Sequence, residues 1–411
     1  MTIACSDLSV YVDEPAPKVV LSWGLGEDST AILLRWLEDP TSRDFELNEL
    51  VVVSAMTGNE WESTRAEVEE HVLPRLAAAG VRLLQVARAR RHVTKAGDGV
   101  VVLDDSRSPT RLYIEGAFTL YDEMVEAGTI PQSGGARMCS VHSKGDALDP
   151  VIAKVTRGQP YRHVMGFEAG ERRRAEKDAG YNTDLRTGEY PLIVWGWFRD
   201  DAIVYTESVI GTGVGKSACT FCPFAFANKS NRAEIFARYA ADPAVGAQTL
   251  LMEHLALALN PAQGLVGGRR LIDLLRADEM TGVLDAFDDV LAAQPHALYD
   301  VRRILRPRKN DPTKLGNAAR SVRVRMRGTR EEMDAILTRL AKEERAQGVL
   351  EREVGADGIV RLYRHRRGPV FPTIERYFVV APALAADKEH DNFNQWWAGA
   401  LAATPAVSAA A

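Results

Sequence analysis

The segment that most constrains the fold is residues 18–30, where an apolar run passes through a glycine-rich turn into a helical pattern. Residues 18–22 predict a buried strand, and residues 30–37 have the apolar spacing of an amphipathic helix. Between them, Gly24 and Gly26 let the backbone approach an anion closely, and the free N–H groups at a helix start favour negative charge. The segment therefore predicts a strand, an anion-binding turn and a helix.

Further apolar runs extend this pattern along the first half of the chain. Residues 49–54, 81–86 and 163–166 predict strands, and residues 63–79 predict a helix between the first two of them. Strands that alternate with helices predict an α/β fold with a doubly wound parallel sheet. Ligands of such sheets bind at the carboxyl ends of the strands, where the glycine turn and Thr57-Gly58 both fall.

The rest of the chain predicts additional parts. Helical spacing dominates after the cysteines, a stretch rich in Pro, Lys, Asn and Gly follows, and alternating strands then surround one amphipathic helix. We expect a nucleotide-binding domain with a cysteine site at residues 1–225 and a helical segment at residues 226–304. A linker at 305–320, a small basic α+β domain at 320–382 and a flexible tail at 383–411 should follow.

Composition is that of an ordinary globular protein, with 46% hydrophobic and 26% charged residues. No run of 18 apolar residues occurs, and the first residues lack the pattern of a secretory leader, so we expect a cytoplasmic protein without membrane contact. Four cysteines in 411 residues are too few for a disulfide scaffold. In a cytosolic protein a Cys-x2-Cys pair more often binds metal or is redox-active.

Charge is unevenly distributed. Residues 301–370 contain 19 Lys and Arg against 9 Asp and Glu, whereas the whole chain has a net charge of −5. Arg323, Arg325 and Arg327 alternate, so a strand would present them on one face. Further arginines lie nearby, at positions 320, 364, 366 and 367. We expect residues 301–370 to bind a nucleic-acid backbone, either DNA or tRNA; the alternative is a solvated basic surface.

Three cysteines form a candidate metal site: Cys139, Cys219 and Cys222. Thiolates are soft ligands that favour iron–sulfur clusters or zinc, and a Cys-x2-Cys turn can hold one metal centre. We expect a [4Fe–4S] cluster whose fourth position is open or filled by Ser140, His142 or Cys5. Zinc with His142 as the fourth ligand is the alternative, and buried cysteines without metal are the third interpretation.

The glycine turn resembles the PP-loop of the adenine-nucleotide alpha-hydrolase superfamily, in particular its phosphoadenosine phosphosulfate (PAPS) reductase-like branch. That loop typically reads Ser-x-Ser-Gly-Gly-Lys-Asp-Ser-Thr, and the residues that match it in register are Ser22, Gly26, Asp28, Ser29 and Thr30. The chain departs from the pattern at Gly24, Leu25 and Glu27, and Glu27 replaces a phosphate-facing lysine.

Four further segments resemble the same branch in the same order. They are residues 56–64, with Thr57, Gly58 and Glu60; residues 139–150, with Cys139 and Lys144; residues 166–174, with Gly166, Arg172 and Arg174; and residues 191–223, with Cys219-x2-Cys222-Pro223. Met56 and Ser140 depart from it, replacing an acid and a second cysteine. Residues 211–217 look like a Walker A loop, but their first glycine is one residue too close to Gly215-Lys216.

The resemblance implies a reaction and a set of roles. ATP with Mg²⁺ would be cleaved between its α and β phosphates, an acceptor would be adenylylated, and sulfur from a donor protein would displace the AMP. The implied catalytic residues are Asp28, Ser29 and Lys144. The implied nucleotide-binding residues are Ser22, Gly24, Gly26, Asp28, Ser29, Thr57, Gly58, Glu60, Gly166, Arg172 and Arg174, and the metal ligands are Cys139, Cys219 and Cys222.

Two rival functions remain open at this point. Reduction of PAPS or adenylyl sulfate uses a nucleophilic cysteine near the C-terminus in the family, and no cysteine follows Cys222 here. A catalytically degenerate scaffold that binds nucleic acid is the other rival, favoured by Glu27 and Met56.

Overall fold

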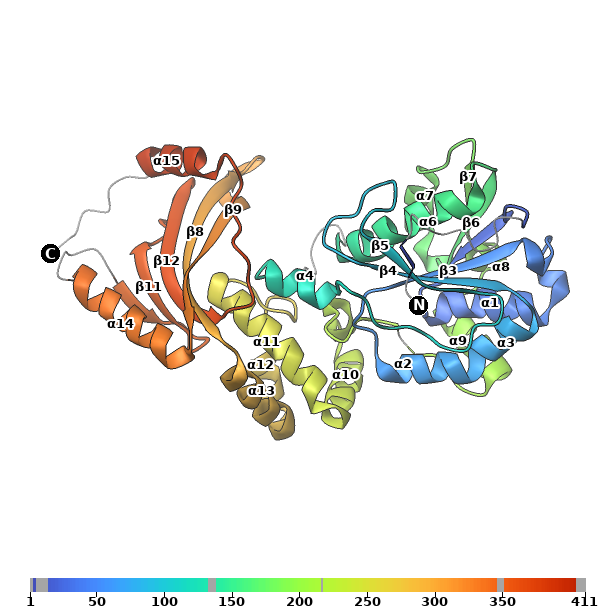
Figure 1. The fold of residues 1–411 in the computed structure, drawn as a ribbon, viewed down its shortest axis with the longest axis horizontal. Coiled ribbons are helices and arrows are strands. Elements are labelled where there is room, and N and C mark those ends of the chain that lie inside the picture. The colour runs from blue at the N-terminus through green and yellow to red at the C-terminus, as the bar shows by residue number, and fades with distance from the viewer. Residues whose placement is uncertain (1–2, 5–13, 132–137, 216, 346–350, 404–411) are drawn as a thin grey trace. The chain divides into compact units, whose positions relative to one another are not determined.

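A computed structural model of the chain describes residues 3–4, 14–131, 138–215, 217–345 and 351–403. The chain divides into two compact units (Figure 1). The first comprises Met1–Glu123 and Gly134–Cys222, and the second comprises Met124–Ser133 and Pro223–Ala411.

The first unit contains a seven-stranded mixed sheet of order β1-β5-β4-β3-β2-β6-β7. Its strands are β1 (Ile3–Ala4), β2 (Val19–Ser22), β3 (Leu50–Met56), β4 (Arg82–Arg88), β5 (Val100–Ser106), β6 (Tyr161–Met165) and β7 (Arg186–Glu189). Strands β4, β3, β2, β6 and β7 are neighbours in this order and run parallel to one another. Strands β5 and β1 lie at one edge and pair antiparallel. The strand order reverses between β2 and β6, and such a reversal is where ligands bind in open α/β sheets.

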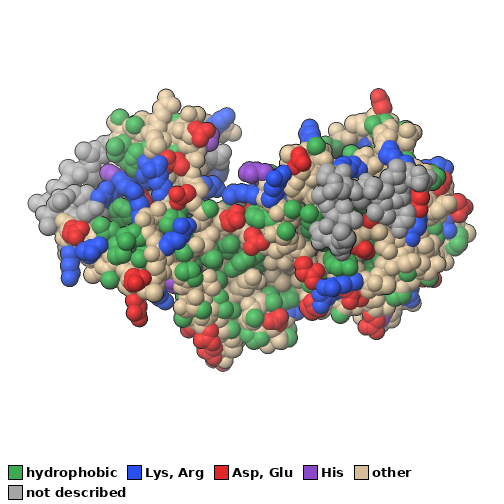
Figure 2. Space-filling model, in the orientation of Figure 1, with side chains coloured by type: hydrophobic (Ala, Val, Ile, Leu, Met, Phe, Trp, Pro, Cys, Tyr) green, Lys and Arg blue, Asp and Glu red, His purple; other side chains and the backbone are tan. Residues whose placement is uncertain are grey.

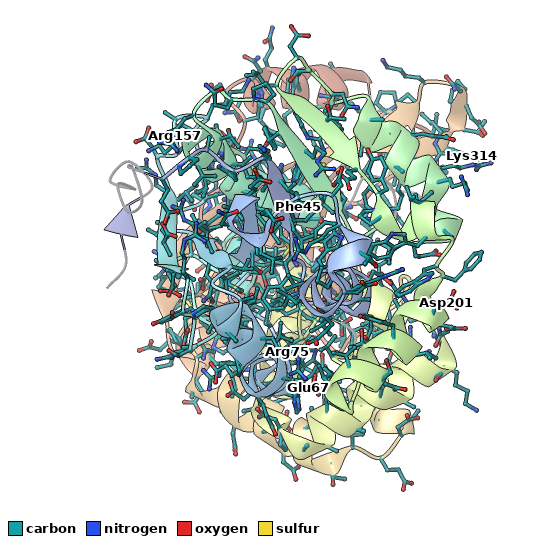
Figure 3. The ribbon with its side chains drawn as sticks, turned by 90° about the vertical axis from the view of Figure 1, so that its right-hand side faces the viewer. Phe45, Glu67, Arg75, Arg157, Asp201 and Lys314 are labelled. Atoms are coloured by element: carbon teal, nitrogen blue, oxygen red, sulfur yellow. The ribbon has the colours of Figure 1, made fainter. Side chains whose placement is uncertain are left out.

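Helices cover both faces of this sheet (Figure 1). In β2, Val19 and Leu21 pack with α1 (Glu27–Glu38) and α3 (Leu73–Ala78), whereas Val20 packs with α6 (Asp146–Thr156) on the other face. Phe45, labelled in Figure 3, contacts Trp36 of α1 edge-on, with ring centroids 5.0 Å apart. All seven residues of β3 are buried, as expected for a central parallel strand.

The remaining helices of the first unit lie at its strand ends and connections. They are α2 (Glu62–Glu67), α4 (Leu120–Glu126, which crosses into the second unit), α5 (Met138–Ser140), α7 (Arg172–Ala179), α8 (Pro191–Trp195) and α9 (Arg199–Ile210). A π-helical turn, Val141–Gly145, joins α5 to α6.

The second unit combines a helical layer with a five-stranded antiparallel sheet of order β10-β11-β12-β8-β9. The helices that precede the sheet are α10 (Lys229–Ala241), α11 (Pro243–Leu259), α12 (Leu271–Ala277) and α13 (Thr281–Ala293). The strands are β8 (His296–Arg308), β9 (Asp311–Gly328), β10 (Glu351–Val354), β11 (Val360–His365) and β12 (Thr373–Pro382).

Two later helices, α14 (Arg330–Arg345) and α15 (Phe393–Ala403), pack on one face of this sheet. Leu298 belongs to the hydrophobic cluster between the sheet and α14, and Ile304 belongs to the cluster between the sheet and α15. These two residues are six positions apart in a regular strand, so their side chains point to the same face.

The α/β class with a mostly parallel sheet is confirmed, and three predicted boundaries are corrected. Residues 305–320, predicted as a linker, form the paired ends of β8 and β9. Residues 296–304, predicted as helical, belong to β8. Residues 393–403, predicted within a flexible tail, form α15, whose Phe393 is fully buried. Among the described residues, no helix is both long and apolar enough to cross a membrane.

Candidate nucleotide site

The glycine turn lies at the carboxyl end of β2, beside the point where the strand order reverses. Trp23 N donates to Val53 O of β3 at 2.9 Å, which ties the turn to the neighbouring strand. Gly26 is the N-cap of α1 and has no side chain to satisfy the first N–H groups of that helix. The turn thus has the backbone arrangement that suits an anion.

Ser29 holds the turn together and is itself closely packed. Its Oγ accepts from Gly24 N at 3.2 Å and donates to Gly26 O at 3.3 Å. Gly166, which follows β6, lies so close that a Cβ there would be 2.9 Å from Ser29 N. Glycine at 166 is therefore required by the approach of the two segments, which brings two predicted site residues together.

Ser22 is part of a half-buried polar chain that sequence reasoning missed. Its Oγ lies 2.8 Å from His163 Nε2, and Arg186 Nε donates to His163 Nδ1 at 3.0 Å. Because Nδ1 accepts from a guanidinium, the imidazole proton lies on Nε2 and points to Ser22 Oγ. Burial and the Arg186 charge lower the pKa of His163 to about 4. His163 therefore cannot act as a base on Ser22, whose own hydroxyl proton remains available to an anion.

The turn after β3 is closed by Glu60. Its carboxylate accepts from Thr57 N at 2.9 Å, Thr57 Oγ1 at 2.7 Å, Gly58 N at 3.0 Å and Asn59 N at 3.1 Å. Gly58 has φ of +77°, in the left-handed region that favours glycine. These bonds give Glu60 a structural role, because it fixes the turn that presents Thr57.

A small cavity brings four of the predicted segments together. It is lined by Gly24, Glu60, Thr64, Lys144, Ser217, Ala218 and Cys219. Thr57 Oγ1 lies 3.4 Å from Cys219 Sγ, and Thr220 N donates to Asn59 O at 2.9 Å. Residues far apart in the sequence thus surround one space, which includes the ammonium-bearing Lys144.

The two acidic residues at the start of α1 differ in their partners. Asp28 forms an ion pair with Arg199, the first residue of α9, which sequence reasoning did not identify. Glu27 is 9% exposed, and its Oε1 accepts from Gly215 N at 2.9 Å. Burial raises the pKa of Glu27 to about 7, and the nearby charges of Asp28 and Glu207 add to this rise. Residue 216, the lysine of the Walker-like loop, lies outside the described residues.

The arginines predicted to hold phosphate begin α7. Arg174 forms an ion pair with Glu171 at 2.5 Å, and its guanidinium lies 4.4 Å from the centroid of the Phe167 ring. Arg172 and Arg173 are exposed, and neither has an ion pair within the described ranges. Arg174 is therefore engaged, whereas Arg172 can still meet a ligand.

Two of the three cysteines of the predicted metal site, Cys219 and Cys222, lie in one turn. Cys222 N donates to Cys219 O at 2.9 Å, so both thiols belong to one tight turn that suits a shared metal. Burial raises the pKa of the Cys219 thiol to about 12, so a metal would have to displace its proton. In the described part of the chain no three ligating side chains form a group that could hold a metal, and Cys139, Cys219 and Cys222 stay the predicted ligands. We derive no chemical step through a cluster.

Of the three proposed fourth ligands, Ser140 is exposed at the end of α5. His142 is partly exposed, and its Nδ1 lies 3.8 Å from Glu123 Oε1. Cys5 lies outside the described residues.

Comparison with known proteins identifies no relative. No protein-family model matches the chain, and no curated protein and no solved structure matches it either.

Proposed function

We propose that the first unit is a PP-loop ATP pyrophosphatase of the PAPS reductase-like kind, which adenylylates an acceptor for sulfur transfer. The observation that carries this proposal is the cavity lined by Gly24, Glu60, Lys144 and Cys219. These residues come from four segments that separately resemble the family, and they meet at the carboxyl ends of β2 and β3.

The reaction would proceed in two displacements. An acceptor oxygen attacks the α-phosphorus of ATP, the bond to the β-phosphate breaks, and pyrophosphate leaves with the bonding electrons. A sulfur nucleophile from a donor protein then displaces AMP from the activated acceptor. The glycine turn and Ser22 would hold the phosphates, and Lys144 would supply the positive charge that Glu27 does not.

Different residues would hold Mg²⁺ and a metal cluster. Asp28 lies two residues after Gly26, and Mg²⁺ prefers such oxygen ligands, although Arg199 holds this carboxylate here. The thiols of Cys219 and Cys222 would be the ligands of an iron or zinc centre, which thiolates favour.

The acceptor we propose is a nucleic acid, bound through the C-terminal sheet. Most predicted contact residues are already engaged: Arg323 pairs with Glu389, Arg325 with Asp300, and Arg366 with Glu351 and Glu353. Arg320 donates to Gly128 O at 2.9 Å and is also engaged. Figure 2 shows Lys and Arg side chains beside acidic ones over this unit. The cations that form no ion pair in the described ranges include Arg306, Arg308 and Lys309, at the end of the β8–β9 hairpin.

The test is the identity of the products released from MgATP. Wild-type protein with an acceptor should release pyrophosphate and AMP, and Ser29→Ala and Lys144→Ala should each reduce this by roughly tenfold or more. Matched controls are Ser208→Ala and Lys177→Ala, at exposed positions of α9 and α7, which should retain activity. Release of ADP and phosphate would contradict the proposal. Tight binding of PAPS with no use of ATP would favour the sulfonucleotide reductase instead.

A further inference from the structure

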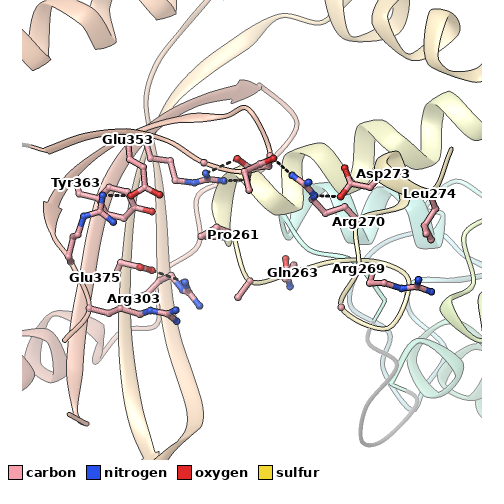
Figure 4. A pocket seen from close by; sticks show the side chains of 18 residues that line it. Pro261, Gln263, Arg269, Arg270, Asp273, Leu274, Arg303, Glu353, Tyr363 and Glu375 are labelled. Carbon is pink, nitrogen blue, oxygen red and sulfur yellow. Dashed lines mark hydrogen bonds and ion pairs between the residues drawn. The ribbon is translucent and has the colours of Figure 1, made fainter. Parts of the chain in front are cut away.

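The second unit contains a cavity of about 750 Å³ on the sheet face opposite to α14 and α15 (Figure 4). One wall is formed by the sheet, with Arg303, Glu375, Arg361 and Tyr363. The other wall is formed by residues 261–270 and the start of α12. This volume lies in the range of small-molecule sites, which is roughly 300–1,000 Å³.

Buried ion pairs fix the sheet wall. Arg303 Nη1 lies 2.7 Å from Glu375 Oε2, and each residue is 5% exposed. Arg361, which is 2% exposed, binds Asp357 at 2.6 Å and donates to Leu257 O at 2.7 Å. Such pairs hold side chains in one geometry because separating them would leave a buried charge unpaired.

A buried carboxylate fixes the facing loop. Glu253 of α11 is 1% exposed and accepts from Leu265 N at 2.9 Å and Leu271 N at 2.8 Å. Gly264 is needed within this loop, because a Cβ there would lie 2.4 Å from Gly268 O. Arg270 also donates to Ala356 O, which joins the loop to the sheet side. The cavity therefore has two preorganised walls.

The charges that line the cavity do not cancel. Six arginines and four carboxylates line it: Arg269, Arg270, Arg303, Arg361, Arg366 and Arg367, with Asp273, Glu353, Asp357 and Glu375. Four of the arginines form ion pairs with these four acids. Within the described residues Arg269 and Arg367 have no carboxylate partner, and both are exposed at the cavity. The lining therefore has a charge of +2, the difference between six and four.

Two buried polar atoms of the lining residues also lack partners among the described residues. Arg361 Nε is a donor and Gln263 Oε1 is an acceptor, and neither makes a hydrogen bond there. Buried polar groups are normally satisfied, so these two atoms are exceptions among the lining residues.

We infer that this cavity binds a phosphate monoester. Such a group carries about −1.5 to −2 charges near pH 7, which matches the excess of the lining. Arginine forks bind phosphate oxygens with two parallel hydrogen bonds, and Arg269 and Arg367 have their guanidinium groups available for this. The cavity has room for the rest of a nucleotide. The phosphate would belong either to a free nucleotide or to the 5′ end of a nucleic-acid strand. All lining residues lie in the second unit, so the inference does not depend on the reaction proposed for the first.

The experiment is calorimetric titration of full-length Ser29→Ala protein, in which the glycine-turn site is weakened. AMP should bind and adenosine should not, since only AMP has the phosphate. Arg269→Ala with Arg367→Ala should weaken AMP binding by roughly tenfold or more for each arginine that contacts the phosphate. The matched control, Arg330→Ala with Arg339→Ala on exposed positions of α14, should bind as the parent does.

Two further ligands identify the source of the phosphate. An oligonucleotide with a 5′-phosphate that binds more tightly than AMP would indicate a strand end, and weaker binding would indicate a free nucleotide. In the strand-end case the same oligonucleotide with a 5′-hydroxyl should lose this affinity. Equal binding of AMP and adenosine would overturn the inference. So would unchanged AMP binding by the Arg269 and Arg367 double variant, with its fold verified by circular dichroism.

Discussion

Glu27 is the residue at which this chain departs most clearly from the PP-loop pattern, and the structure gives the substitution a physical role. Its carboxyl accepts from Gly215 N, while its other oxygen, Oε2, is buried without a partner among the described residues. A carboxyl held in this way is easier to bury when it is protonated. Its pKa is accordingly raised to about 7, mainly by burial.

Glu27→Gln should therefore change how stability depends on pH. The folded protein holds this proton up to about pH 7, whereas the unfolded carboxyl releases it near 4.5. Between these values the folded state binds more protons, so wild-type stability falls as pH rises, and the loss is complete above about pH 7. Glutamine removes this loss and should be more stable than wild type at pH 8.5, by up to roughly 3 kcal/mol.

Urea unfolding at pH 4.5 and at pH 8.5 measures this effect. The advantage of Glu27→Gln over wild type should be larger at pH 8.5 than at pH 4.5. The control, Glu176→Gln at an exposed position of α7, should show no such dependence. A Glu27→Gln advantage of the same size at both values would show that Glu27 is ionised in the folded protein throughout.

At the scale of elements, the α1 start and the end of β6 are fitted to each other through Gly166. A Cβ at this position would be 2.9 Å from Ser29 N and 3.1 Å from Ser29 Cα, and neither backbone atom can rotate away. Gly166→Ala should thus displace the start of α1, lower stability by roughly 1–3 kcal/mol, and weaken ATP binding.

Thermal unfolding and nucleotide titration measure this result. The control is Gly399→Ala in α15, where a Cβ would meet no atom within 4 Å. Because alanine favours helix over glycine, Gly399→Ala should be neutral or slightly stabilising. Normal ATP binding by Gly166→Ala would show that this close approach serves packing alone.

The elements also show what the sequence could predict. The parallel strands were predictable because their residues are apolar throughout, as in β3. Strand β8 was not, because Asp300, Arg302 and Arg303 interrupt its apolar pattern and are tolerated through ion pairs with distant residues. Helix α15 was predicted as part of a flexible tail because its composition is rich in alanine, although Phe393 and Trp397 pack with the sheet.

The candidate site, too, could be predicted from the sequence only in part. The turn at Gly24 and the Thr57-Gly58 turn could be located, because each follows an apolar strand. The partners Arg199 and His163 could not, because no motif gives them a role and they reach the site only through the fold. Ser217 ends the Walker-like segment, but that pattern does not place it beside Gly24.

At the scale of the whole molecule, the charge asymmetry remains the main indication of a large anionic partner. Ion pairs engage many of the cations in residues 301–370 but leave the β8–β9 hairpin end positive. A cavity of about 950 Å³ there is lined by Arg306, Arg308 and Lys309, together with Trp396 and several apolar residues. No carboxylate lines it among the described residues. Cations beside an aromatic ring suit a single strand, whose phosphates and bases they can bind together.

Reversing these three charges should therefore weaken nucleic-acid binding more than reversing three others. The test variant is Arg306→Glu with Arg308→Glu and Lys309→Glu. The matched control is Arg330→Glu with Arg339→Glu and Lys342→Glu, which makes the same charge change on exposed positions of α14. Binding of a single-stranded oligonucleotide is measured by fluorescence anisotropy across a series of salt concentrations.

The hairpin variant should lower the slope of log affinity against log salt by roughly one unit for each phosphate that the protein no longer neutralises. The α14 variant should keep the wild-type slope, because its changes alter net charge at positions that do not meet the strand. Equal weakening in both variants would mean that only net charge matters, and the hairpin would then not be the binding surface.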